Sequence, residues 1–281
     1  MKTIRDSVWF ITGASVGFGL ALANEVLGRG GRVVATARHR ASIAALEAGA
    51  PDRVLALALD VTRPEQIAAA VSAAQTRFGR IDVLVNNAGY GFLSGMEEGS
   101  DAEARAQFDV NFFGLAAVTR AVLPILRRQR SGQIVNISSA AGVFAMGGSA
   151  YYSASKFALE ALSEALAQEV APFGVGVLIV EPGAFRTDFF GRSLATPARP
   201  IEDYPELKAA RESYSRISGQ QPGDPLKAAT AIVDTLLSER PPLRLILGSG
   251  AFERIRKALE GRLAEVERSR TIAHQVEFPA A

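Results

Sequence analysis

A tyrosine and a lysine, Tyr152 and Lys156, stand one helical turn apart in an alanine-rich stretch from about residue 151 to residue 171. The stretch predicts a helix, and side chains four residues apart on a helix lie on the same face. A phenol with a pKa of about 10 is a poor acid at neutral pH, but a neighbouring cation stabilises the phenolate and lowers this pKa. The pair could therefore make a proton donor of the tyrosine. The alternative is an ordinary amphipathic surface helix.

Polar residues at two earlier positions could complete such a site. Asn111 lies in a long apolar stretch, 102–129, that predicts a helix, and Pro124 is expected to kink or end it. A buried asparagine needs hydrogen-bond partners, so Asn111 is either structural or part of a polar site. Ser138 and Ser139 follow a predicted strand. Because side chains alternate along a strand, only one of the two serines can face a crevice.

A glycine-rich turn follows the first predicted strand, residues 8–12, and precedes a helical pattern that starts near Phe18. Such a turn lets backbone N–H groups and a helix N-terminus approach a phosphate, because side chains there would block it. A second predicted strand, 32–37, completes a βαβ unit, which favours a dinucleotide site over a plain tight turn. The spacing differs from the common G-x-G-x-x-G, since the glycines are Gly13, Gly17 and Gly19.

The residues after the second strand bear on which dinucleotide binds. An acidic residue at this place would bind the ribose 2′-hydroxyl of NAD, but the chain has Arg38, His39 and Arg40 instead. A guanidinium can pair with a 2′-phosphate. Arg38 therefore predicts NADP(H), preferred over NAD(H), with Arg40 as a possible helper; the alternative is a solvated arginine.

Strands and helices alternate from residue 8 to about residue 181 without a linker or an internal repeat. This order predicts an α/β fold in which one open parallel sheet has helices on both faces. An irregular, proline-rich segment, 188–224, follows the sixth strand and is a candidate substrate lid. Strands are predicted at 8–12, 32–37, 54–59, 81–85, 133–137, 175–180 and 243–247, and helices at 64–78, 102–129, 151–171, 206–217, 225–238 and 251–266, with 267–281 unassigned.

The composition excludes several classes of function. The chain has 281 residues and a net charge of +2, so we expect neither a nucleic-acid nor a membrane partner. It contains no cysteine, and its two histidines, His39 and His274, are far apart, so we expect no disulfide and no metal site. The first residues lack the apolar segment of a signal peptide, and a cytoplasmic location is expected.

Taken together, the motifs resemble the short-chain dehydrogenase/reductase family over roughly residues 5 to 190. The resemblance rests on an ordered set: Thr12-Gly13-x-x-x-Gly17-x-Gly19, Asp60, Asn87-Ala88-Gly89, Asn111, Ser139, Tyr152-x-x-x-Lys156 and Pro182-Gly183-x-x-x-Thr187. It implies a single domain, 1–281, with a seven-stranded Rossmann sheet in the order 3-2-1-4-5-6-7. The cofactor-binding and catalytic core would span 5–187, and 225–281 would add the last helices and strand. Most members are homodimers or homotetramers.

The resemblance also implies a role for each catalytic residue. Tyr152 would be the general acid that protonates a carbonyl oxygen, or the base for the reverse oxidation. Lys156 would lower the pKa of Tyr152 and hold the nicotinamide ribose. Ser139 would hydrogen-bond the substrate oxygen, a choice over Ser138 that follows the family spacing. Asn111 would hold a water that links Lys156 to solvent.

The cofactor contacts implied by the resemblance fall into three groups. The pyrophosphate would be held by Gly13, Ser15, Gly17, Phe18 and Gly19. The adenine and its ribose would lie against Asp60, Val61, Asn87, Ala88 and Gly89. The carboxamide would be bound by the segment that contains Pro182, Gly183, Phe185 and Thr187.

The leading hypothesis is an NADP(H)-dependent carbonyl reductase or alcohol dehydrogenase. Its small-molecule substrate would be a moderately apolar ketone or secondary alcohol. An alternative is a non-catalytic cofactor sensor or scaffold on the same fold. Epimerases or dehydratases among the extended relatives are disfavoured by the glycine spacing and the short C-terminal region. The candidate pocket residues, for which core or lid packing is an equal alternative, are Phe92, Phe144, Met146, Phe189 and Phe190.

Overall fold

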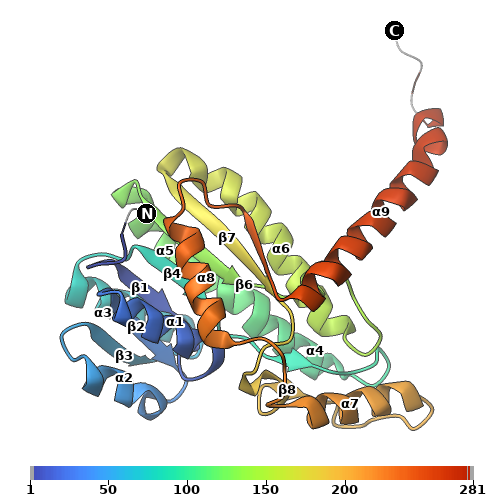
Figure 1. The fold of residues 1–281 in the computed structure, drawn as a ribbon, viewed down its shortest axis with the longest axis horizontal. Coiled ribbons are helices and arrows are strands. Elements are labelled where there is room, and N and C mark those ends of the chain that lie inside the picture. The colour runs from blue at the N-terminus through green and yellow to red at the C-terminus, as the bar shows by residue number, and fades with distance from the viewer. Residues whose placement is uncertain (1–2, 277, 279–281) are drawn as a thin grey trace.

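The computed structural model describes residues 3–276 and 278 and is organised around a parallel sheet of seven strands (Figure 1). The strand order is β3-β2-β1-β4-β6-β7-β9. Counted along the chain, this is the order 3-2-1-4-5-6-7, so the fold prediction is confirmed. The strands of this sheet are β1 Val8–Ile11, β2 Arg32–Ala37, β3 Val54–Ala58, β4 Val83–Asn86, β6 Gly132–Ile137, β7 Val175–Pro182 and β9 Arg244–Leu247.

Helices cover both faces of the sheet, and a hydrophobic cluster lies under each layer. Buried side chains of α1 (Gly17–Gly28) and α8 (Pro225–Leu237) pack on one face, and those of α3 (Pro64–Phe78), α5 (Leu115–Gln129) and α6 (Ala150–Val170) pack on the other. The β1 residues are all buried, as expected for a central strand covered on both sides. The remaining helices are α2 Ala44–Gly49, α4 Asp101–Phe108, α7 Pro205–Ile217 and α9 Ser249–Gln275.

The long helical stretch predicted at 102–129 is interrupted by a π-helical turn, Asp109–Gly114, between α4 and α5. Ser100 and Glu103 form a capping box that fixes its start. Pro124 lies inside α5, so of the two expected effects, a kink or an end, the end of the helix does not occur. Its missing N–H group leaves the carbonyl of Arg120 without a helical donor, and Arg120 is exposed, where water can replace that donor.

By length and composition alone, one helical stretch of the described chain, Asp101–Gln129, is apolar enough to cross a membrane. Its apolar residues include Val118, Val122 and Leu126, which are fully buried in the cluster on the sheet. Packing in the core therefore accounts for the apolar character of this helix.

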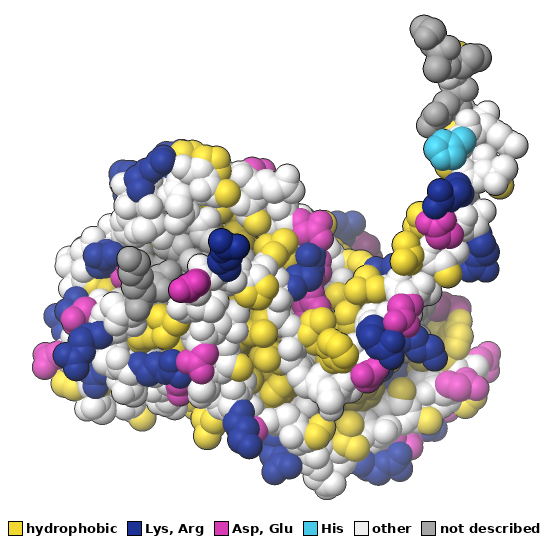
Figure 2. All heavy atoms as spheres, turned by 45° about the horizontal axis from the view of Figure 1, so that its top comes forward, with side chains coloured by type: hydrophobic (Ala, Val, Ile, Leu, Met, Phe, Trp, Pro, Cys, Tyr) yellow, Lys and Arg dark blue, Asp and Glu magenta, His cyan; other side chains and the backbone are white. Residues whose placement is uncertain are grey.

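The C-terminal helix α9 continues well past the predicted range 251–266 and projects away from the sheet (Figure 1). Ala251 and Ile255 are its buried residues, and they pack against the 140–144 segment. Figure 2 shows both acidic and basic side chains along the projecting part. The former unassigned tail is thus helical as far as Gln275.

The segment 188–224 contains two elements that lie close to the loop after β4. A two-stranded parallel sheet pairs β5 (Gly91–Phe92) with β8 (Leu194–Ala195), and sequence patterns this short predicted neither strand. Helix α7 follows, close to the range predicted for it at 206–217. In Figure 1 both elements lie at the same end of the molecule as α4.

Candidate active site

Tyr152 lies in the first turn of α6 at the carboxyl edge of the sheet, and Ser139 follows β6 beside it. The Ser139 side chain is close enough to the Tyr152 phenol to act on its pKa. Ser139 also accepts a hydrogen bond from the Ala141 backbone N–H at 3.1 Å, which caps the short helical turn that follows. Ser138 is buried and instead lies beside Glu160, on the other side of the strand. The alternation of side chains along β6 thus places Ser139, and not Ser138, in the crevice.

Lys156 lies one helical turn after Tyr152 and is buried. Its Nζ donates a hydrogen bond to the carbonyl oxygen of Ile137 at 2.8 Å, and it lies 5.9 Å from the centre of the Tyr152 ring. Burial lowers the pKa of Lys156 to about 8, and nearby Glu160 acts in the opposite direction. The last residue of β6 and the start of α6 are therefore joined through the lysine.

The pKa of Tyr152 is raised to about 12, mainly because burial disfavours the phenolate, while Ser139 acts to lower it. The predicted lowering by Lys156 is not what the structure gives, and the physical reason is the position of the ammonium group. It lies over the ring and donates to a backbone carbonyl group. The phenol is therefore protonated at neutral pH.

Asn111 lies within the π-helical turn and is buried, facing Gly89. Its Oδ1 accepts the Tyr90 N–H at 3.1 Å, and its Nδ2 donates to the Tyr90 carbonyl at 2.9 Å and to Ser155 Oγ at 3.3 Å. A Cβ on Gly89 would lie 3.1 Å from Asn111 Oδ1 and 3.8 Å from Lys156 Nζ. The structure therefore brings Asn111, Gly89 and Lys156 together. A wider helical turn of this kind is frequent at functional sites.

The glycine-rich turn forms a cradle that side chains would fill. Gly13 and Gly17 have φ values of +66° and +56°, which favour glycine. A Cβ on Gly19 would lie 2.3 Å from the Gly13 carbonyl oxygen and 2.6 Å from Asn87 Nδ2. The N-cap of α1 is Val16, and no described side chain caps this end of the helix. The turn thus fits a phosphate, which the helix N-terminus would attract.

Asn87 joins this cradle to the end of β4. Its Nδ2 donates to the carbonyl oxygens of Thr12 and Gly13, both at 2.9 Å. The hydroxyl of Thr12 accepts the backbone N–H groups of Asn87 and Ala88, at 2.9 Å and 3.0 Å. The Asn87 side chain thus supports the cradle, and Thr12 is a supporting residue missing from the predicted site. Its position directly before Gly13 is the sequence signal for it.

Arg38 lies exposed after β2, and its charge is close enough to Asp60 to help lower the pKa of that carboxyl group. Thr62 donates two hydrogen bonds to Asp60 Oδ1, at 3.0 Å and 2.8 Å. Arg40, the suggested helper, donates to the Ala56 carbonyl oxygen and pairs with Glu47, so its role is structural. Arg38 makes no hydrogen bond or ion pair within the described residues, and it is available to an anion.

The segment after β7 packs against the glycine-rich turn and the start of α1. The ring of Phe185 lies 5.0 Å from that of Phe18, and a Cβ on Gly17 would lie 3.4 Å from Thr187 Cβ. The Gly183 N–H is bonded to β9, which fixes the direction of the segment. The remaining predicted contacts are at the same edge: Ser15 in the turn, Val61 after β3, and Pro182 at the end of β7.

Of the five candidate pocket residues, Phe189 packs against Tyr152, with 5.7 Å between the ring centres and the rings tilted by 53°. Phe190 continues this contact, at 5.9 Å from Phe189. Phe92 is buried and stacks on Tyr151, while Phe144 and Met146 lie against Arg254 of α9. Packing therefore accounts for these three.

Tyr214 and Glu98 are two residues near the site that sequence reasoning missed. The Tyr214 ring lies 4.8 Å from that of Phe190, and its phenol is close enough to Tyr152 to contribute, after burial, to the raised pKa of Tyr152. Glu98 is buried and pairs with Arg211. No local pattern indicates either, because their partners are far away in the sequence.

The chain is similar to several proteins of known family. The model of the short chain dehydrogenase family matches residues 7–197. The chain is 39% identical over 267 residues to Oxidoreductase BOA17 of Botryotinia fuckeliana, covering 95% of this chain and 97% of the relative. It is 39% identical over 251 residues to human Retinol dehydrogenase 8, covering 83% and 79%. It is 35% identical over 246 residues to a 3-ketodihydrosphingosine reductase of Bacteroides thetaiotaomicron, covering 87% and 89%.

Solved structures show the same similarity. A short-chain dehydrogenase from Streptomyces avermitilis superposes with a TM-score of 0.91 at 43% identity, covering 98% of this chain and 100% of that one. A Burkholderia phymatum short chain dehydrogenase/reductase in complex with NAD gives 0.81 at 26% identity, covering 91% and 94%. A Burkholderia cenocepacia short chain dehydrogenase in complex with NADP gives 0.74 at 29% identity, covering 95% and 98%. Both dinucleotides thus occur among its structural neighbours.

Proposed function

The chain belongs to the short-chain dehydrogenase family and is an oxidoreductase of that type, and from this premise we propose its specific reaction. It transfers a hydride between NADP(H) and a ketone or secondary alcohol of moderately apolar character. The observation that carries this proposal is the meeting of Tyr152, Ser139 and Lys156 at the sheet edge, beside the ring of Phe189. A protein that only bound a cofactor would have no evident need of all these groups.

The phosphate cradle and Arg38 are the parts of the chain that would hold the cofactor. The backbone N–H groups at the start of α1 would bind the pyrophosphate, and Arg38 would pair with the 2′-phosphate. The buried Lys156 ammonium would bind the ribose next to the nicotinamide. When bound, the nicotinamide supplies or accepts the hydride.

Tyr152 and Ser139 would act on the substrate oxygen. The phenol of Tyr152 holds its proton at neutral pH, because its pKa is about 12, and it can donate this proton to an oxygen that gains negative charge. The Ser139 hydroxyl would donate a second hydrogen bond to the same oxygen. This protonation state suits reduction of a carbonyl group.

The proposed apolar character of the substrate rests on the lid and on the relatives. Phe189 and Phe190 lie next to Tyr152, on the side from which a substrate would approach. Relatives named a retinol dehydrogenase and a 3-ketodihydrosphingosine reductase act on an alcohol and a ketone. A screen of carbonyl compounds that follows NADPH consumption tests the proposal, and failure to reduce any of them despite NADPH binding would contradict it.

The preference for NADP(H) depends on Arg38 and has its own test. We expect NADPH to raise the melting temperature more than NADH does, since ligand binding to the folded state stabilises it. The Arg38→Asp variant should lose roughly tenfold or more in NADPH affinity, because a charge-assisted contact becomes a repulsion. Arg63→Asp is a matched control, as Arg63 also faces Asp60 but is paired with Glu65. Equal stabilisation of the unmodified protein by NADH would overturn the preference.

We also propose a cytoplasmic homodimer or homotetramer, an expectation that comes from the family. Exposed apolar side chains on the projecting part of α9, among them Leu259, Leu263 and Val266, support an additional contact between copies. Light scattering of the purified chain at several concentrations measures the subunit number, and a monomer throughout would contradict this proposal.

A further inference from the structure

Glu98 is a buried carboxylate outside the crevice, in the loop that follows β5. Its side chain is 0% exposed. Arg211 of α7 donates two parallel hydrogen bonds to it, Nη1 to Oε2 at 2.8 Å and Nη2 to Oε1 at 3.0 Å. The backbone N–H of Gly95 donates to Oε2 at 2.8 Å, and that of Ile201 donates to Oε1 at 3.0 Å. We call Glu98 and these donors the lid clamp, because they join the loop after β5 to two places in the lid.

All four contacts of the clamp favour the ionised carboxylate. The hydrogen bonds from Arg211 are the main reason that the pKa of Glu98 falls to about 2, and the two backbone donors add to this effect. A fork of two parallel bonds fixes direction as well as distance. The clamp therefore stays charged at neutral pH and holds α7 in one orientation.

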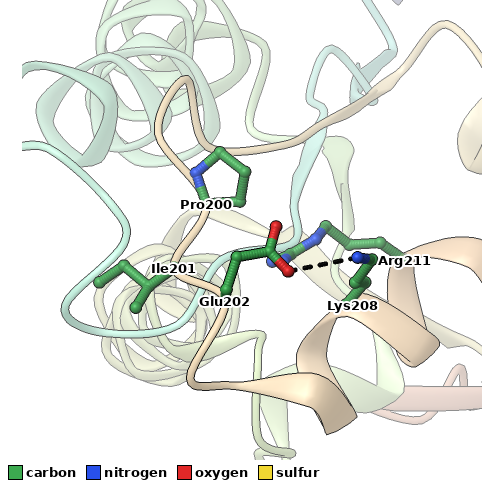
Figure 3. Close-up of a pocket in the computed structure, with 5 residues that line it drawn as sticks. All are labelled: Pro200, Ile201, Glu202, Lys208 and Arg211. Carbon is green, nitrogen blue, oxygen red and sulfur yellow. Dashed lines mark hydrogen bonds and ion pairs between the residues drawn. The ribbon is translucent and has the colours of Figure 1, made fainter.

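Small residues let α7 approach the rest of the molecule closely. A Cβ on Gly95 would lie 2.6 Å from Leu207 Cδ1, and one on Gly148 would lie 3.0 Å from Leu207 Cδ2. Gly148 immediately precedes the residues that begin α6, the helix of Tyr152. A small cavity of about 110 Å³ lies between α7 and the Pro200–Glu202 segment. Figure 3 shows Arg211 among the residues that line it.

Three aromatic side chains, Phe189, Phe190 and Tyr214, connect α7 to the proton donor Tyr152. Ring centres are 5.7 Å apart for Tyr152 and Phe189, 5.9 Å for Phe189 and Phe190, and 4.8 Å for Phe190 and Tyr214. Tyr214 lies three residues after Arg211 on α7, so the two share a face of that helix. The position of α7 thus determines where Tyr214 lies and, through the row of tilted and edge-on ring contacts, where Phe189 meets Tyr152.

We propose that Glu98 is a positioning residue for the substrate side of the crevice. By holding Arg211, it keeps the lid in the place that sets Phe189 and Phe190 against Tyr152. Glu98 touches neither the cradle nor Tyr152, and it acts through Arg211. This role rests on the proposed function, since it concerns the binding of a carbonyl substrate beside Tyr152.

The test compares Glu98→Gln with Glu202→Gln, the same change at an exposed lid acid that pairs with Lys208. For Glu98→Gln we expect KM for the best carbonyl substrate from the screen to rise about tenfold, with kcat and the Kd of NADPH changed less than about twofold. Trypsin should also cut faster at the exposed Arg192 and Lys208, because the lid is less ordered. Glu202→Gln should leave KM and cleavage unchanged.

Arg211→Lys provides a second variant in case Glu98→Gln fails to fold. It keeps the charge but loses the fork, so we expect a smaller rise in KM in the same direction. Lid cleavage that stays unchanged in both variants would overturn the clamp. The positioning role would be overturned if cleavage became faster while KM stayed unchanged. It would also be overturned if kcat and NADPH affinity fell together with the rise in KM. If the unmodified chain reduces no carbonyl compound, the proposed function fails, and the cleavage rates still decide whether the clamp holds the lid.

Discussion

The two sides of the crevice are built in different ways. The cofactor side consists of the turn 13–19 and the segment 87–89, and backbone contacts fix it: a Cβ on Gly19 would lie 2.3 Å from the Gly13 carbonyl oxygen. The proposed lid, 188–224, is held by the short backbone pairing of β8 with β5 and by particular side chains, such as the pair of Glu98 with Arg211 and the hydrogen bond from Tyr204 to Glu97. The first side therefore depends on glycines where a Cβ would not fit, and the second depends more on particular side-chain partners.

This difference matches what each side would bind. A phosphate needs backbone N–H groups at close range, and few sequences can provide them. An apolar substrate needs a pocket of suitable shape, which many combinations of side chains can form. Changes in the lid can therefore alter the substrate without disturbing the cofactor site, and variants on the two sides should separate in their effects.

The largest expected effect comes from the residue that both sides share. Tyr152→Phe keeps the ring that lies 5.7 Å from Phe189 but removes the proton donor. We expect turnover of the best carbonyl substrate to fall by about a thousandfold. The Kd of NADPH should stay within about twofold, since the cradle is untouched. Steady-state kinetics and a fluorescence titration of NADPH measure the two quantities, and a variant that keeps a tenth of its rate would remove Tyr152 from this role.

A smaller effect is expected at the cradle, where two glycines of α1 can be compared. Gly19→Ala forces a methyl group against the Gly13 carbonyl oxygen and Asn87, which should cost about 3 kcal/mol in NADPH binding or in folding. Gly28→Ala is the matched control, because no atom lies within 4 Å of its Cβ position. It should be neutral or slightly stabilising. Isothermal titration with NADPH and thermal unfolding measure both variants. Equal behaviour of the two would show that the lack of room for a Cβ at Gly19 does not matter for NADPH binding or folding.

The same contrast explains how much the sequence could predict. The sheet order and the cradle were predictable, because buried apolar strands and glycines at fixed spacing leave few alternatives. The choice of Ser139 over Ser138 followed from family spacing, and the structure gives the reason in the direction of the two side chains. The predicted lowering of the Tyr152 pKa by Lys156 does not occur, since burial raises this pKa and the ammonium group donates to a backbone carbonyl group instead.

The lid could be recognised only as an irregular segment with prolines. Its clamp joins Glu98 to Arg211, and its short strand β8 pairs with β5. Contacts between residues about a hundred positions apart leave no local pattern. The glycine cradle could therefore be predicted from the sequence, whereas the contacts of the segment 188–224 could be found only in the structure.

The buried acids of this chain also differ in how fully their charge is balanced. In the clamp one carboxylate meets one guanidinium, whereas beneath α6 two buried acids share one. Arg244 Nε lies 3.2 Å from Glu160 Oε2 and 3.1 Å from Glu181 Oε1, and the exposed Glu164 also contacts Arg244. Burial raises the pKa of Glu181 to about 7, and Glu160 adds to this effect. Glu160 also faces Ser138, and it lies one turn after Lys156 on α6.

A third effect, smaller than the one at Gly19, follows from this excess of acid and should depend on pH. The folded-state pKa of Glu181, about 7, lies above its ordinary value of 4.5, so the folded chain holds the proton more tightly than the unfolded chain. The stability from this group is complete below about pH 4.5 and is lost as the pH rises through 7. Glu181→Gln mimics the protonated acid, so its stability relative to the unmodified chain should improve by about 2 kcal/mol between pH 5 and pH 8.5.

Urea unfolding at both pH values measures this change in relative stability, with Glu164→Gln as the exposed control. Since Gln cannot ionise, a difference between Glu181→Gln and the unmodified chain that stays constant with pH would mean that Glu181 is already charged at pH 5. In that case the two buried acid sites would be alike, and Arg244 would balance both carboxylates as fully as Arg211 balances one.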